Sequence, residues 1–149
     1  MNTLTHSMPQ PARWLGFGGL VPFCSLAAAS LLDPSYASRW AFALLAYGAV
    51  ILSFVGALHW GFATVWQSES VGRRARMMYW SVVPALGAWL ALLLPPQAGA
   101  GMLSVLFVVH YLFDVALARR GQLPTWYLRL RTPLTIGAVA SLATATITL

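Results

Sequence analysis

Charged side chains are scarce in this sequence. Only 8% of its 149 residues are charged, three are acidic and none is lysine. Soluble domains carry roughly 25% charged residues, so this chain cannot solvate an ordinary globular surface. Its nine basic residues are all arginines, and they lie in the gaps between hydrophobic runs rather than along one face. The sequence therefore excludes a nucleic-acid-binding role and predicts a membrane protein, with the lipid bilayer as its principal partner.

Cysteine and catalytic motifs are also nearly absent. The single cysteine, Cys24, excludes an intrachain disulfide and a cysteine-based metal site, and its place inside a hydrophobic run predicts a buried structural thiol. The chain has no nucleophile elbow, no H-E-x-x-H, no P-loop and no Rossmann fingerprint. These absences favour a non-enzymatic protein, and we expect no metal and no cofactor.

Five hydrophobic runs fill the sequence after a short N-terminal tail at 1–13. Each run is apolar around its whole circumference, so its length of about 20 residues decides for a membrane-spanning helix over a strand. The predicted fold is therefore all-α, a single bundle of five transmembrane helices at about 14–32, 39–66, 77–94, 98–118 and 132–149.

The arginines predict the orientation of the bundle. With five spans, eight arginines fall on one side of the membrane, and only Arg39 falls on the other. The positive-inside rule then places the N-terminus in the cytoplasm and the C-terminus outside.

The run from Trp40 to Trp66 holds 27 residues without a formal charge, yet it includes His59. An ionisable group at membrane depth is costly and is by default a candidate functional site. The same run has small residues at every fourth position, a pattern that lets another helix approach closely. This stripe is Ala49, Ser53, Ala57 and Gly61. Because the stripe and His59 lie on different faces, we expect this helix at the centre of the bundle.

A second histidine is expected at the same depth. His59 lies about 10 Å from the end of its span and His110 about 12 Å from the same side, at 1.5 Å per residue. Asp114 follows His110 by four residues and so shares its helical face. These three residues, with Trp60 and Tyr111, are the candidate ligand-binding residues of a polar pocket in the inner leaflet.

Four interpretations of this pocket stay open. The first is a structural cluster in which His110 and Asp114 pair with each other and with Arg119. The second is a site for a quinone, lipid or other small molecule, and the third is a proton or ion path. The fourth is a bis-histidine haem site between His59 and His110.

The segment 123–131 mixes aromatic residues, leucines and arginines and is expected to lie along the inner interface, where arginines meet anionic headgroups. Its candidate interface residues are Trp126, Tyr127, Arg129 and Arg131.

Two stretches carry a resemblance to a known family. They are YGAVILSFVGALHWG at 47–61 and PTWYLRLRTPL at 124–134. They resemble a domain-of-unknown-function family of small multi-span proteins from proteobacterial inner membranes, which has a mitochondrial branch of transmembrane proteins. The resemblance implies the bacterial inner membrane and no particular activity. Its motif positions here are Tyr47, Ser53, Gly56, His59, Trp60, Gly61, Trp126, Tyr127, Arg129 and Arg131.

The sequence as a whole favours a non-enzymatic inner-membrane protein that serves a larger membrane complex as an accessory or assembly component. The alternative is a protein that binds or transports a small molecule in the inner-leaflet pocket.

The orientation can be tested with a topology reporter fused after Leu149. We expect reporter activity outside the cytoplasm, because eight arginines hold the opposite end inside. Cytoplasmic activity of the same fusion would contradict the predicted orientation.

Overall fold

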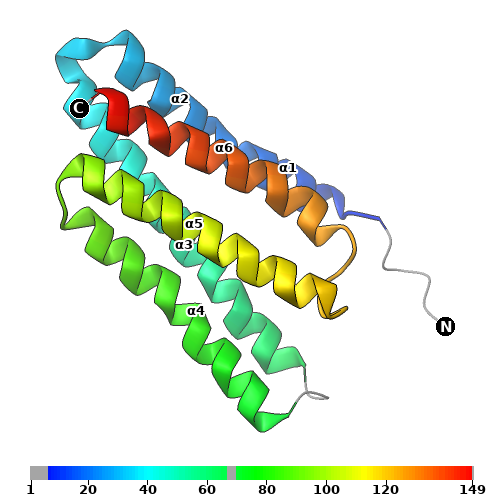
Figure 1. Cartoon of the computed structure of the whole chain (residues 1–149). Coiled ribbons are helices and arrows are strands. Elements are labelled where there is room, and N and C mark those ends of the chain that lie inside the picture. Colours follow the sequence, from blue (N-terminus) through cyan, green and yellow to red (C-terminus); the bar gives the residue numbers. More distant parts are fainter. Residues whose placement is uncertain (1–6, 67–69, 149) are drawn as a thin grey trace.

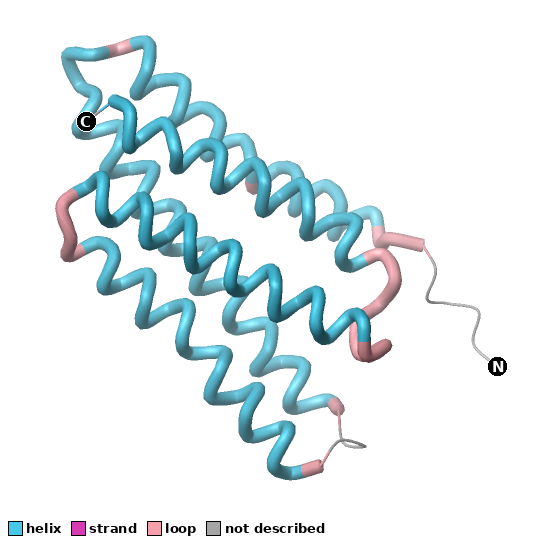
Figure 2. Tube along the Cα trace, viewed as in Figure 1, coloured by secondary structure: helices cyan, strands magenta, loops and turns pink. Residues whose placement is uncertain are grey.

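The computed structural model describes residues 7–66 and 70–148. From α3 onward, each long helix runs antiparallel to the one before it in the chain, in one bundle (Figures 1 and 2), and the described residues contain no strand. The helices are α1 (Gln10–Gly18), α2 (Leu20–Leu32), the short 3₁₀ helix η1 (Pro34–Tyr36), α3 (Ala37–Val65), α4 (Val71–Leu92), α5 (Pro96–Arg119) and α6 (Tyr127–Thr148). The predicted all-α fold is confirmed.

Four of the helical segments in the described part of the chain are long and apolar enough to cross a membrane: α1 with α2, α3 with η1, α5, and α6. The remaining helix, α4, falls short because its first turns carry Arg73, Arg74 and Arg76. Only its later part, from Met77 to Leu92, is free of charge.

The first predicted span is broken near its start. The α1 helix begins at Gln10, inside the predicted tail, where Pro9 and Pro11 suit the start of a helix. It ends at Gly18 because Pro22 has no N–H to offer the Gly18 carbonyl. The Tyr47 hydroxyl donates to the next carbonyl, that of Gly19, at 2.9 Å. A side chain of α3 thus binds the backbone next to the break.

The last helix begins five residues earlier than predicted. A turn after Pro124 leads directly into α6 at Tyr127, and Pro133 lies inside the helix rather than in its first turn. The early start turns Tyr127 and Arg131 into the bundle, where both are buried. Arg129 stays exposed.

The α3 helix is central, as predicted, since it packs against α2, α4, α5 and α6. Its closest approach is to α4, where a Cβ added at Gly56 would lie 3.0 Å from Pro84. The small-residue stripe is only half used, because Ala49 is buried whereas Ala57 and Gly61 are exposed. Cys24 is exposed too, on the outer face of α2, so the predicted buried thiol is wrong.

Two apolar cores follow each other along the bundle. The larger core includes Leu52, Val55 and Phe107, and the smaller includes Ala63 and Leu117. On α3 and α5 the interval between the two cores is occupied by histidine and aspartate.

The ends of the bundle differ as well. The start of α1, the end of α3, the start of α4, the end of α5 and the start of α6 lie together at one end (Figure 1), which we call the basic end because eight of the nine arginines lie in or next to these parts of the helices.

Candidate functional site

A polar layer separates the two apolar cores. It consists of His59 from α3, His110 and Asp114 from α5, and Arg131 from α6, which we call the Asp114 cluster. The side chains of His59 and Asp114 have no exposed surface, and His110 and Arg131 are 1% and 5% exposed. Three helices therefore bring their ionisable groups together out of reach of solvent.

Asp114 is the hub of the cluster. Its Oδ2 accepts a hydrogen bond from Arg131 Nε at 2.9 Å. Its Oδ1 lies 3.1 Å from His59 Nε2, although the two atoms are not aligned as a hydrogen bond. The carboxylate thus ties α5 to α6 by an ion pair and faces α3 with a histidine. Burial of an unpaired carboxylate is very costly, so Arg131 is what allows Asp114 to be ionised at this depth.

Aromatic rings close the layer on its sides. The His59 and His110 rings meet edge to face with their centroids 4.7 Å apart. Trp80 of α4 stacks parallel to His110 at 6.2 Å and against Phe113 at 4.7 Å. The α4 helix thereby reaches the cluster through an indole ring. Because the two histidine rings contact each other directly, no room remains between them for the porphyrin of a bis-histidine haem site.

Several polar atoms of the layer have no hydrogen-bond partner. Among them are both ring nitrogens of His110, although the Val55 carbonyl lies near that ring. The Arg131 Nη2 and the Tyr127 hydroxyl are likewise buried and unpaired, and Tyr127 lies beside the Asp114 carboxylate. Each unsatisfied buried group costs about 1–3 kcal/mol. These atoms are therefore candidates for hydrogen bonds to a bound molecule.

The ligand-type atoms of His59, His110 and Asp114 lie within 4.8 Å of one another. This donor set would suit a transition metal, but the charges do not. Arg131 already neutralises the one carboxylate, so a divalent ion would leave two uncompensated positive charges in an apolar layer. Charge balance therefore argues against a divalent metal here.

Two cavities lie on either side of the cluster. The first, of about 410 Å³, is walled by α1, α3 and α6, and we call it the α1–α3–α6 chamber. Most of the residues that line it are apolar, and the lining consists of Ala12, Leu15, Gly16, Phe54, Val55, Leu58, Phe62, Pro124, Trp126, Tyr127, Leu130, Arg131 and Leu134.

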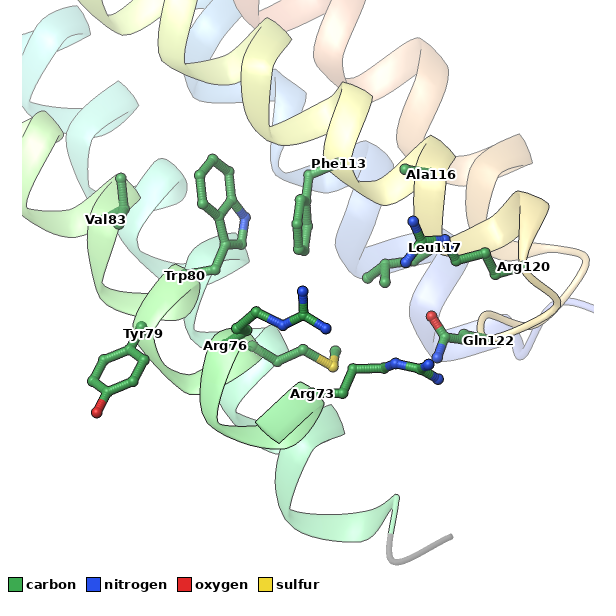
Figure 3. A pocket seen from close by; sticks show the side chains of 11 residues that line it. Arg73, Arg76, Tyr79, Trp80, Val83, Phe113, Ala116, Leu117, Arg120 and Gln122 are labelled. Atoms are coloured by element: carbon green, nitrogen blue, oxygen red, sulfur yellow. The ribbon is translucent and has the colours of Figure 1, made fainter. Parts of the chain in front are cut away.

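The second cavity, of about 470 Å³, lies between α4 and α5 at the basic end, and we call it the α4–α5 groove. Figure 3 shows the rings of Trp80 and Phe113 at one end of the groove and arginine side chains at the other. The rings that contact the histidines therefore also form the wall of this groove.

The predicted site residues are only partly brought together. His59, His110 and Asp114 meet, as their common depth suggested. Trp60 is 52% exposed and points away, and Tyr111 instead shares a hydrogen bond of 2.8 Å with Thr132 of α6. The predicted partner of Asp114, Arg119, lies exposed at the end of α5.

The structure adds residues that the sequence analysis placed elsewhere. Arg131 and Tyr127 were expected at the interface, but both face inward. Their spacing of four residues, which puts them on one helical face, and the need of a membrane-buried aspartate for a cation were signals that pointed to this role. Trp80 and Phe113 carry no comparable signal among so many aromatic residues.

Comparison with known proteins gives the family. A family model described as "Protein of unknown function (DUF3429)" matches residues 8–147. The chain belongs to this family. It is 39% identical over 134 residues to "Transmembrane protein 69" of Xenopus tropicalis, which covers 90% of this chain and 53% of that protein. The protein of the same name from Mus musculus is 27% identical over 142 residues, covering 94% of this chain and 58% of its own.

These matches confirm the resemblance to a domain-of-unknown-function family with a transmembrane-protein branch. Together with the apolar helices, they make this DUF3429 protein a multi-pass membrane protein. The chain spans about half the length of the curated relatives it matches. No solved structure matches it.

The ion pair at the centre of the cluster gives a stability prediction. Replacing Asp114 by asparagine leaves the Arg131 charge buried without a counter-charge, which typically costs about 3–5 kcal/mol. We expect the Asp114→Asn variant to lose stability of this order in detergent unfolding. The double variant with Arg131→Met removes the stranded charge and should recover most of the loss.

Asp33→Asn is the matched control, because Asp33 lies outside the cluster and its carboxylate accepts a hydrogen bond from Trp40. We expect it to lose far less stability. A double variant no more stable than Asp114→Asn alone would show that the ion pair does not hold the layer.

Proposed function

We propose that this DUF3429 protein binds an apolar molecule with a hydrogen-bond-accepting headgroup in the α1–α3–α6 chamber. The observation that carries this proposal is the pair of buried donors in an otherwise apolar lining. Tyr127 and Arg131 both line the chamber, and the Tyr127 hydroxyl and the Arg131 Nη2 both lack a partner.

The size and chemistry of the chamber define the ligand class. Its volume of about 410 Å³ lies in the range of small-molecule sites, about 300–1,000 Å³. The apolar walls suit a ring or a hydrocarbon chain, and the two donors suit a carbonyl oxygen, as in a quinone or a lipid ester. A small hydrophilic anion would find no polar wall beyond these donors.

The Asp114 cluster fixes one of the donors in place. Because Arg131 Nε is held by Asp114, its planar guanidinium presents a second edge in a set direction. The proposed role is binding, without a catalytic step, and we propose the bacterial inner membrane as its location.

Removing one donor tests the chamber. The Tyr127→Phe variant keeps the ring and loses the hydroxyl, and the loss of one hydrogen bond of about 1 kcal/mol weakens binding roughly fivefold. The probe is a benzoquinone carrying a decyl tail, titrated into the full chain in detergent, with direct measurement of bound quinone.

Tyr79→Phe is the matched control, since Tyr79 is 75% exposed and lies on α4, outside the chamber. Its affinity should equal that of the unchanged protein. An unchanged affinity in Tyr127→Phe, or an equal loss in Tyr79→Phe, would refute the chamber as the binding site.

The accessory-component hypothesis is the second candidate, and one observation favours it. Ala57 and Gly61 are exposed on α3, and nothing lies within 4 Å of a Cβ added at Gly61. The neighbouring Trp60 is exposed as well. We propose that a transmembrane helix of another membrane protein packs on this half of the stripe, since small residues allow close approach.

Enlarging both residues tests this second candidate. Ala57→Leu with Gly61→Leu should remove the proteins that co-purify with the chain from native membranes in mild detergent. Ala140→Leu, at an exposed position of α6, should retain them. If the unchanged chain purifies without partner proteins, this candidate is wrong.

A further inference from the structure

We propose that the α4–α5 groove binds the phosphate headgroup of an anionic phospholipid. Its arginines come from two sides of the groove. Arg73 and Arg76 lie at the start of α4, and Arg120 directly follows α5. This site is distinct from the α1–α3–α6 chamber, with which it shares no lining residue.

The arginines surround one space. Figure 3 shows the Arg76 guanidinium below the rings of Trp80 and Phe113, with the ends of Arg73 and Arg120 across the groove. No acidic side chain is among the described residues that line it. Arg76 and Arg120, from opposite walls, therefore give the groove positive charge. Guanidinium groups match phosphate oxygens with paired hydrogen bonds.

The rest of the wall is apolar and leads away from the arginines. The rings of Trp80 and Phe113 and the side chain of Val83 continue the groove along the bundle. A molecule that fills both parts must have an anionic head and a hydrocarbon chain beside it. The groove thus fits an amphiphile better than an inorganic anion.

The position of the groove selects a membrane lipid as the source of that amphiphile. The groove lies at the basic end, where the ends of the apolar helices carry arginines. Arginines at such a boundary sit at headgroup level. The α4 helix is also the one whose first turns keep it short of a full span, and a headgroup bound in the groove would lie beside its Arg76.

The test compares two double variants that remove the same charge. Arg76→Gln with Arg120→Gln changes the groove, whereas Arg119→Gln with Arg129→Gln removes two exposed arginines near the basic end that do not line it. The full chain is incorporated into vesicles of phosphatidylcholine with one tenth phosphatidylglycerol. It is then extracted in mild detergent, and retained phosphatidylglycerol is measured by native mass spectrometry.

We expect the groove variant to retain roughly tenfold less phosphatidylglycerol, the equivalent of about 1.4 kcal/mol, and the control variant to match the unchanged protein. A third variant, Ala116→Trp, fills the groove without changing charge and should also lose the lipid, while Ala140→Trp on α6 should not.

Three results would overturn the proposal. Equal loss in both arginine variants would mean that the whole basic end attracts lipid without a defined site. Release of the lipid by millimolar inorganic phosphate would mean that the groove recognises the anion alone. Retention of no phosphatidylglycerol by the unchanged protein would mean that the groove does not hold this lipid. None of these results depends on the quinone probe or on Tyr127.

Discussion

The structure depends on one buried carboxylate. Asp114 lies without exposed surface between two apolar cores, where an isolated charge is prohibitively costly. Arg131 supplies the counter-charge at 2.9 Å, and it can do so only because α6 begins at Tyr127, early enough to turn Arg131 inward. The start of α6, its register against α5 and the burial of the polar layer therefore depend on one another.

The broad architecture follows from the sequence because its causes are local. The length and apolar character of each run predict a helix, and the odd number of runs separates the start of α1 from the end of α6, which lie at opposite ends of the bundle (Figure 1). The common depth of His59 and His110 follows from counting residues along helices of opposite direction. Prolines mark the helix ends near Leu32 and Leu94, and Pro22 follows the break between α1 and α2.

The inward turn of Arg131 was not predictable in the same way, because it depends on packing between helices far apart in the sequence. Taken alone, 123–131 is a typical interfacial segment, and only the position of Asp114 on the neighbouring helix changes its energetics. The small-residue stripe on α3 likewise does not predict which of its halves packs against another helix of this chain. Gly56, outside the stripe, makes a close approach instead, because any side chain there would meet Pro84 and the Ser81 carbonyl.

The two cavities are linked by the layer between them. The α1–α3–α6 chamber contacts it through Arg131, and the α4–α5 groove contacts it through Trp80 and Phe113, whose rings lie against His110 and His59. A headgroup in the groove would press on the same rings that position the histidines, whereas a ligand in the chamber would meet the guanidinium that Asp114 holds. Because close-packed interiors transmit displacement, we expect a ligand in one cavity to shift side chains that line the other.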